Sequence, residues 1–437
     1  MEATRDRLAP DAAQPHFDRS QAVGIVHFGI GAFHRAHQAW YTDQVLATGA
    51  RGWMIAGVSL RSPEVAAQLN PQGGLYTLTE RSGDGASTRL IGAVREVLVA
   101  GADSAAVVAR IASPDCHIVS FTVTEKGYCR AADGSLDRAA AATGFYPLLA
   151  EGLARRRDAG LPGLTLLSCD NLGANGRALG RLMREWLAGD HALARWFDAE
   201  CTVPDTMIDR IVPATTERDR EQLAARIGLE DAGAVFAEPF SQWVIEDSFA
   251  GPRPRWEDHG VQFVRDVAPY EAAKLRMLNG AHSLLAYCGL AAGHEFVHQA
   301  IADPRLRALA TGLMVEAAPT IATGEGQDLD AYAADLLARF ANPAMRHRLA
   351  QIAMDGSQKI PQRWLATLAD RSAQGLESPA IEEAMRCWLD HLRGGRDVND
   401  PLAPQLQQLL EGASVTEGWN RVFGPRGMLA AGAAAAE

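Results

Sequence analysis

In the stretch GIVHFGIGAFHRAHQAW, residues 24–40, two glycines join a short apolar run to a helical segment, which is the pattern that indicates the fold. The run GIVHF is typical of a buried strand in a parallel sheet, and Ala32 to Leu46 predicts an amphipathic helix. In a dinucleotide site, the first glycine makes a tight turn and the second lets the backbone approach the pyrophosphate. Gly29 and Gly31 match these positions. The pattern GxGxxH has no third glycine, so a plain strand-to-helix turn is the alternative interpretation.

The same alternation of apolar runs and helical stretches continues to about Asp170. Further buried strands are predicted in WMIAGVSL, HIVSFTV and LTLLSCD. This rhythm predicts an α/β fold, a doubly wound Rossmann-type domain with helices on both faces of its sheet. From about Asp266 the pattern becomes helical almost to the end. The predicted organisation is a flexible extension at residues 1–20, a dinucleotide-binding domain at 21–265 and a mainly α-helical substrate-binding domain at 266–437.

Composition excludes several classes of protein. The chain has 437 residues, 47% hydrophobic and 22% charged, which is the balance of an ordinary soluble globular protein. Its net charge of −11 argues against binding to nucleic acid or to a membrane surface. Six scattered cysteines without a CxxC pair, and the lack of a signal peptide or membrane span, predict a cytoplasmic protein. The charge is compatible with a monomer or a homodimer.

The predicted second strand ends in GVSLRS, at the place where an acidic residue usually holds the adenosine ribose of NAD. This chain offers Ser59 and Arg61 there instead. Arg61 could equally contact the 2′-phosphate of NADP, so this feature leaves both cofactors open. His34 and His37 lie three residues apart on the first helix, but they have no third ligand nearby and make a poor zinc site. We therefore predict no metal.

A second informative stretch is PYEAAKLRMLNGAH, residues 269–282. On an α-helix, Glu271, Lys274, Asn279 and His282 share one face of a largely apolar segment. Burial lowers the pKa of a lysine toward neutrality, which suits a group that exchanges a proton. The Asn279 amide can donate to an oxygen that gains charge, and His282 can orient that oxygen. The alternative is a lysine that reaches solvent beside a core histidine.

Asp170 and Asn171 follow the predicted strand LTLLS. Ligands meet open parallel sheets at the carboxyl ends of the strands, so Asn171 could supply a second amide to an oxyanion site. The alternative is ordinary helix capping by Asp170 or Asn171.

Seven motifs between residues 22 and 365 resemble the mannitol dehydrogenase and fructuronate reductase family, the long-chain polyol-specific dehydrogenases. They are GIGAFHRAHQAWYTDQVL, SFTVTEKGYC, SCDNLGANG, MIDRIVPAT, EPFSQWVIED, KLRMLNGAHS and QIAMDGSQKIPQR. The resemblance implies a Rossmann-type domain, a helical C-terminal domain and NAD as cofactor. It also implies a metal-independent hydride transfer to a ketose-type carbonyl in the cleft between the domains.

The resemblance also implies roles for single residues. By position in the motifs, Lys274 is the general acid/base, and Asn171 and Asn279 are the amides of the oxyanion hole. His282 binds substrate beside the lysine, and Glu271 relays the proton to solvent. Lys359 of DGSQK matches a substrate-binding lysine. The implied cofactor-binding residues are Gly29, Ile30, Gly31, Ala32 and Phe33 of the pyrophosphate turn, and Ile208 and Asp209 near the nicotinamide.

The choice of substrate depends on the branch of the family. Mannitol-type members commonly have an arginine eight residues before the lysine that matches Lys359, whereas this chain has Gln351. The stretches TEKGYC, GAFHRAHQ and QIAMDGSQKIPQR resemble the fructuronate reductase branch more closely. A substrate carboxylate needs a cationic partner, and the candidates are Lys126, Lys359, Arg363 and Arg35.

We therefore predict reduction of D-fructuronate to D-mannonate, or of a related hexuronate. One alternative is a mannitol 2-dehydrogenase or another polyol dehydrogenase. A second alternative, from another class, is a catalytically silent sensor that binds a nucleotide.

Overall fold

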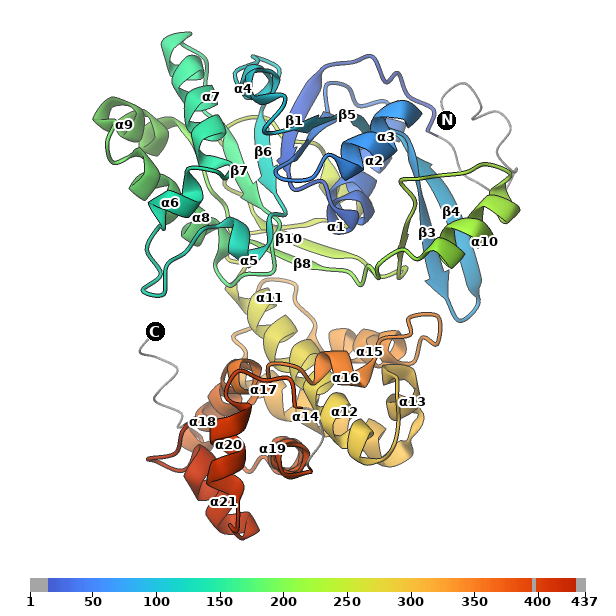
Figure 1. Ribbon diagram of the computed structural model, residues 1–437, viewed down its shortest axis with the longest axis vertical. Helices are drawn as coiled ribbons and strands as arrows, with labels where there is room; N and C mark the ends of the chain where they lie inside the picture. Colours follow the sequence, from blue (N-terminus) through green and yellow to red (C-terminus); the bar gives the residue numbers. More distant parts are fainter. Residues whose placement is uncertain (1–14, 395–397, 430–437) are drawn as a thin grey trace. The chain divides into compact units, whose positions relative to one another are not determined.

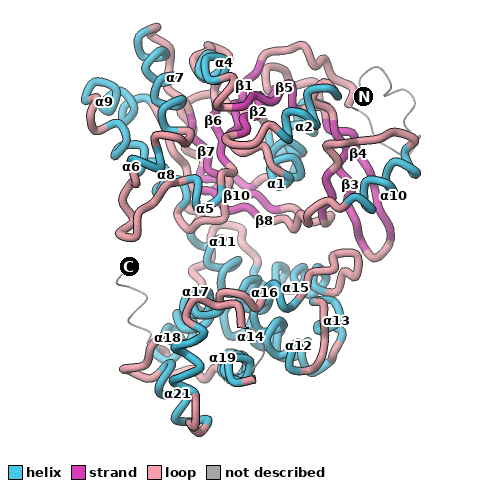
Figure 2. The backbone as a smooth tube through the Cα atoms, in the orientation of Figure 1, coloured by secondary structure: helices cyan, strands magenta, loops and turns pink. Residues whose placement is uncertain are grey.

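The structure of the chain is a computed structural model that describes residues 15–394 and 398–429. The chain divides into two compact units between Val267 and Ala268. This boundary is close to Asp266, where the sequence pattern becomes helical. All strands of the described residues belong to the first unit, and the second unit is built from helices (Figures 1 and 2). The predicted fold class, a Rossmann-type domain followed by a mainly helical domain, is confirmed.

A five-stranded parallel sheet forms the centre of the first unit. Its strands, in spatial order, are β5 (Val94–Val99), β2 (Met54–Ser59), β1 (Val23–Phe28), β6 (Ile118–Phe121) and β7 (Thr165–Ser168). Strand order reverses between β1 and β6. In an open parallel sheet, the carboxyl ends of the strands at such a reversal form the crevice in which ligands bind.

Both faces of this sheet are covered, as the continuous apolar runs predict. Along β1, Ile25 belongs to one hydrophobic core, while Val26 and Phe28 belong to the core of the opposite face. The helices of this unit are α1 (Ala32–Ala36), α2 (Gln38–Ala47), α3 (Glu64–Leu69), α4 (Ser104–Ile111), α5 (Thr124–Gly127), α6 (Arg138–Ala141), α7 (Tyr146–Asp158), α8 (Asn175–Leu187), α9 (His191–Glu200) and α10 (Glu217–Ile227). Figure 1 shows α4 and α7 beside the strands β6 and β7.

Two smaller sheets complete the first unit. One has the order β4 (Gly85–Ile91), β3 (Tyr76–Ser82) and β9 (Val235–Ala237), and the other has the order β11 (Gln262–Val264), β10 (Gln242–Glu246) and β8 (Thr206–Asp209).

The structure corrects two details of the first unit. The single amphipathic helix predicted from Ala32 to Leu46 is two helices, α1 and α2, because the backbone leaves the helical region at His37. Most of α2 is buried on all sides. The predicted extension at residues 1–20 lies mostly outside the described residues, but Arg19 donates to the carbonyl groups of Gly73 and Val94 at 2.6 and 2.7 Å. Arg19 is therefore held to the fold rather than flexible.

The second unit packs around α12 (Gly280–Ala291), most of whose residues are buried. The chain reaches α12 through α11 (Ala268–Ala273) and a π-helix, Lys274–Asn279. A second π-helix, Pro361–Leu365, follows α17 (Gly356–Ile360). The remaining helices are α13 (Val297–Ala302), α14 (Pro304–Ala317), α15 (Leu329–Phe340), α16 (Leu349–Ile352), α18 (Ala366–Ala373), α19 (Pro379–Arg393), α20 (Ala403–Leu410) and α21 (Val415–Phe423).

Candidate active site

The turn after β1 has the geometry that a dinucleotide site requires. Gly29 has φ +93°, and a Cβ atom on it would lie 2.1 Å from the Thr122 carbonyl oxygen, so only glycine fits. Around Gly31, the nearest heavy atom to an added Cβ would be the Gly29 oxygen at 3.8 Å. Gly31 is also exposed, while Ile30 is buried against Gly57. The backbone at Gly31 is thus open to a close ligand, which is what a bound pyrophosphate needs.

A buried polar cluster, not predicted from the sequence, holds the backbone of this turn through the Gly29 carbonyl. Nε2 of His27 lies 2.8 Å from the Thr122 hydroxyl, which donates to the Gly29 carbonyl at 2.6 Å. Nδ1 of His27 lies 2.8 Å from the Ser120 hydroxyl, and the His27 ring stacks on His34 at 3.5 Å. Burial lowers the pKa of His27 to about 3, so the ring is neutral. The sequence signal for this cluster is a histidine inside an otherwise apolar strand.

The two histidines considered as metal ligands are buried; His34 lies in α1, and His37 lies at the break between α1 and α2. His34 stacks on His27, and Nε2 of His37 lies 3.1 Å from the Gln242 carbonyl oxygen. Among residues 15–394 and 398–429, no three His, Cys, Asp or Glu side chains are grouped in a way that could hold a metal ion.

The remaining candidate cofactor residues lie at two strand ends of the first unit. At the end of β2, the Ser59 hydroxyl donates to the Ser62 carbonyl at 2.5 Å, and Arg61 is exposed. Ile208 and Asp209 end β8 and are buried, and Ile208 lies opposite Trp243 of β10. Contact of these residues with a cofactor stays a prediction.

Asp170 does not cap α8, the helix that follows it, because the N-cap residue of α8 is Ala174 and this helix has no side-chain cap. Its carboxylate accepts hydrogen bonds from the backbone N–H groups of Val123 and Thr124, at 3.0 and 2.8 Å, and from the Tyr128 hydroxyl at 3.0 Å. Burial raises its pKa, and these hydrogen bonds oppose that effect. Asp170 thus ties the end of β7 to the loop after β6. Asn171 follows it and is exposed at the carboxyl end of β7, where a ligand of the sheet can reach it.

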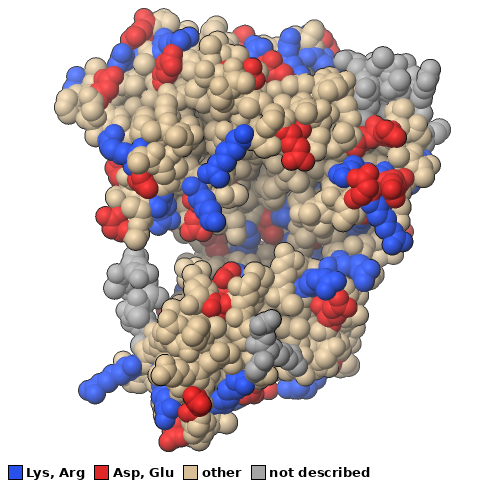
Figure 3. Space-filling view, in the orientation of Figure 1, with Lys and Arg blue, Asp and Glu red and all other residues tan. Residues whose placement is uncertain are grey.

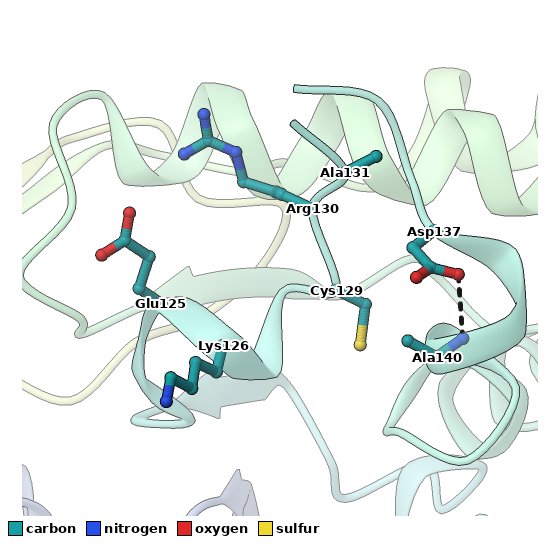
Figure 4. A pocket seen from close by; sticks show the side chains of 7 residues that line it. All are labelled: Glu125, Lys126, Cys129, Arg130, Ala131, Asp137 and Ala140. Atoms are coloured by element: carbon teal, nitrogen blue, oxygen red, sulfur yellow. Dashed lines mark hydrogen bonds between the residues drawn. The ribbon is translucent and has the colours of Figure 1, made fainter. Parts of the chain in front are cut away.

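An open cavity of about 500 Å³ lies beside α5, after β6. Figure 4 shows the Lys126 amine and the Arg130 guanidinium directed to different parts of it. Lys126 is exposed there. The cavity therefore does not offer two convergent cations to an anionic group.

Acidic and basic side chains are interspersed over the face drawn in Figure 3.

The second unit presents the predicted lysine and amide on a π-helix, which corrects the α-helical geometry assumed from the sequence. Lys274 begins this π-helix and Asn279 ends it, and both are partly buried. A π-helix closes its turn with i→i+5 hydrogen bonds, so residues five apart stack on the same side. Lys274 and Asn279 are five apart and therefore share one side of the helix. Single π-turns are frequent at functional sites. Glu271 lies one turn earlier, on α11.

His282 lies in the first turn of α12 and is buried against two further rings. Its ring centre is 4.6 Å from Phe340 and 5.5 Å from His347. Burial is the main cause that holds the pKa of His282 well below its usual value, and nearby His347, Arg339 and Arg363 lower it further. His282 is thus a neutral ring that can orient a ligand oxygen. Phe340 and His347 carry no recognisable motif, so the sequence analysis did not single them out.

The second π-helix packs directly on the start of α12. Nη1 of Arg363 donates to the Ser283 hydroxyl at 2.7 Å and to the Asn279 carbonyl at 3.3 Å. Trp364 donates to the Gly280 carbonyl at 3.1 Å. Two stretches that are 80 residues apart in the sequence therefore meet at the predicted catalytic segment.

Two other candidate partners for a substrate carboxylate have protein partners. Arg35 is buried in the first unit and donates to the carbonyl groups of Gly31 and Gly233. It holds the backbone of the first unit, and its contact with substrate stays a prediction. The Lys359 amine donates to the Met354 carbonyl at 2.5 Å, and burial lowers its pKa.

Comparison with known protein families gives two matches that together span most of the chain. Residues 23–258 match the mannitol dehydrogenase Rossmann domain, and residues 266–422 match the mannitol dehydrogenase C-terminal domain. The chain belongs to the mannitol dehydrogenase family. The resemblance seen in the motifs is confirmed, and so are the predicted enzyme class, an NAD-dependent oxidoreductase of CH–OH groups, and its cofactor at the level of the family.

Relatives of this chain differ in their named substrates. An uncharacterized oxidoreductase of Escherichia coli (strain K12), YeiQ, is 42% identical over 92% of this chain and 86% of its own. The D-mannonate oxidoreductase of the same organism is 40% identical over 91% of this chain and 87% of its own. A solved ternary complex of Pseudomonas fluorescens mannitol 2-dehydrogenase with NAD and D-mannitol is 35% identical, covers 98% of this chain and 93% of that protein, and has a TM-score of 0.81.

Two further observations concern the chain as a whole. All six cysteines carry free thiols. Within the part of the chain that the structure describes, no helix is long and apolar enough to cross a membrane.

Proposed function

We propose that this protein catalyses the NADH-dependent reduction of D-fructuronate to D-mannonate, without a metal, and uses Lys274 as the general acid. The observation that supports the proposal is the π-helix Lys274–Asn279, whose first and last residues are a lysine and an asparagine, both partly buried. An ammonium and an amide N–H are the two groups that a ketone reduction needs at its oxygen.

The reaction adds a hydride and a proton to the C=O bond of the substrate. The bound nicotinamide supplies the hydride to the carbonyl carbon. Lys274 gives a proton to the carbonyl oxygen, and the Asn279 amide stabilises the negative charge that grows there. Asn171 of the first unit supplies a second amide in this proposal, and Glu271 returns a proton to the lysine from solvent. His282, being neutral, orients the oxygen by hydrogen bonding.

The residues around β1 fit a dinucleotide. The open backbone at Gly31 admits the pyrophosphate, and Gly29 makes the turn that precedes it. We propose that Ala32 and Phe33 flank the pyrophosphate, that Ser59 or Arg61 meets the adenosine ribose, and that Ile208 and Asp209 lie by the nicotinamide. NADP is the alternative cofactor, because Arg61 is an exposed cation at the end of β2.

A hexuronate is favoured over a neutral sugar by one relative and by local charge. The D-mannonate oxidoreductase of Escherichia coli is 40% identical to this chain. In addition, the positive charge of Arg363 lowers the pKa of both His282 and Lys359, while Asp355 and Asp400 oppose this effect at Lys359. A substrate carboxylate would offset this potential, whereas a hydroxymethyl group would not. The second candidate is a mannitol 2-dehydrogenase, which the structural similarity to the Pseudomonas fluorescens enzyme favours.

Initial rates with NADH and then NADPH, measured on D-fructuronate, D-tagaturonate and D-fructose, test the proposal. We expect the highest kcat/KM with D-fructuronate and NADH. Equal or better activity on D-fructose would assign a mannitol 2-dehydrogenase. NADH binding without turnover of any of these compounds would indicate the nucleotide-binding sensor. The cytoplasmic location and the monomeric or homodimeric state stay predictions.

A further inference from the structure

Arg363 is a mostly buried guanidinium without a carboxylate partner. It forms no ion pair with any residue in 15–394 or 398–429, and its side-chain hydrogen bonds there go to the Ser283 hydroxyl and the Asn279 carbonyl. Burial lowers the pKa of Arg363 to about 10, so the group is still charged at neutral pH. A buried charge is costly unless an opposite charge or full hydrogen bonding compensates it. A compensating anion would therefore find a strong site here.

The hydrogen bonds of Arg363 fix its position and leave one edge of the guanidinium available. Both protein partners are bound through Nη1, whereas Nε and Nη2 form no hydrogen bond with the described residues. The Nε and Nη2 hydrogens form a fork that matches the two oxygens of a carboxylate. The bond to the Asn279 carbonyl puts this group beside the residue that ends the first π-helix. The available edge thus lies on the segment proposed to bind the ketone oxygen.

The other cations considered for this role have weaker geometry. The Lys359 amine is bound to the Met354 carbonyl, and Arg35 is bound to backbone carbonyls of the first unit. Lys126 is exposed on the open cavity beside α5. Arg363 is the candidate in which burial, an available fork and proximity to Asn279 coincide.

We propose that Arg363 binds the carboxylate of the substrate and is the residue that makes the enzyme prefer hexuronates over neutral ketoses. This inference rests on the proposed function and deepens it. The carboxylate completes the hydrogen bonding of the buried guanidinium. A hydroxymethyl group at the same place leaves the charge unpaired, and a site built for a charged or polar group discriminates strongly against an analogue that lacks it. The wild-type kcat/KM is then at least about 100-fold higher for D-fructuronate than for D-fructose.

The test compares charged and neutral substrates within each variant of the full-length protein. We expect Arg363→Gln to lower the kcat/KM for D-fructuronate at least about 100-fold more than the kcat/KM for D-fructose, mainly through the KM for D-fructuronate. Arg363→Lys keeps the charge but loses the paired N–H donors of the guanidinium. Its kcat/KM should therefore fall about tenfold for D-fructuronate and not for D-fructose. The matched control, Arg386→Gln, removes an exposed arginine that pairs with Glu382 and Glu383. It should leave the kcat/KM for both substrates unchanged.

A second readout does not depend on turnover. D-mannonate should raise the Tm of the wild type and of Arg386→Gln, but not that of Arg363→Gln. If Arg363→Gln does not fold, two other results test the inference. They are the kcat/KM values of Arg363→Lys on both substrates and the wild-type ratio of kcat/KM for D-fructuronate to kcat/KM for D-fructose. Equal losses on both substrates, or full protection of Arg363→Gln by D-mannonate, would overturn the inference while the proposed function stands. A wild type that reduces D-fructose but no hexuronate would overturn both.

Discussion

The two glycines of the β1 turn should respond to alanine in opposite ways. In Gly29→Ala, the new Cβ would lie 2.1 Å from the Thr122 carbonyl oxygen, at φ +93°. A left-handed backbone at a non-glycine residue costs about 1–2 kcal/mol, and overpacking costs about 1–3 kcal/mol. We expect the free energy of unfolding to fall by about 2–5 kcal/mol, the sum of these two costs.

Gly31→Ala meets no such obstacle, because the nearest atom to its new Cβ would be 3.8 Å away and its φ is −79°. Its stability should stay within about 0.5 kcal/mol of the wild type. The methyl group would instead occupy the open backbone face where the pyrophosphate is proposed to bind, so the Kd for NADH should rise at least about tenfold, which is about 1.4 kcal/mol.

Urea unfolding and NADH fluorescence titration of both variants measure these effects. Binding of NADH to Gly31→Ala as tightly as to the wild type would contradict a pyrophosphate site at this backbone. Wild-type stability of Gly29→Ala would show that the left-handed turn is not required.

Two further predictions concern a buried acid and the π-helix. Burial raises the pKa of Asp43 to about 7, so the folded state binds the proton more tightly and stability falls as pH rises from about 4 to about 7. Asp43→Asn can still accept the hydrogen bond from Gly92 N–H. The unfolding free energy of the wild type should fall between about pH 5 and about pH 8, and in Asp43→Asn this fall should be smaller by up to about 3 kcal/mol. Identical pH profiles of the two proteins in urea unfolding would contradict this. Asn279→Ala should lower kcat about 100-fold or more and leave the Kd for NADH unchanged; a change in KM alone would show that the amide does not stabilise charge in the transition state.

The sequence predicted those parts of the fold that depend on local patterns. Strand β1 was recognisable because a strand covered on both faces is apolar throughout, and Ile25 and Val26 do belong to opposite cores. The turn was recognisable because Gly29 adopts a conformation that other residues avoid.

The π-helix was not predictable in the same way. The spacing of Lys274, Asn279 and His282 was evaluated on an α-helix, because no local residue pattern separates an α-turn from a π-turn. The π-helix packs against the second π-helix, and Trp364 of the second π-helix donates to the carbonyl group of Gly280, the residue after Asn279. That contact joins residues 84 positions apart.

The four cations proposed for a carboxylate were also equivalent in the sequence. The four side chains differ in burial and in hydrogen-bond partners, and both of these depend on the tertiary structure. Arg35 is held by backbone carbonyls of its own unit, whereas Arg363 keeps one edge of its guanidinium available.

Steady-state kcat values of two Lys274 variants on D-fructuronate show directly whether the Lys274 amine transfers the proton. Lys274→Ala should lower kcat at least about 100-fold while the Kd for NADH stays as in the wild type. Lys274→Arg keeps the charge but holds its proton too tightly to transfer it at neutral pH, so it should be equally slow. Near-normal turnover in either variant would contradict a proton transfer from this amine.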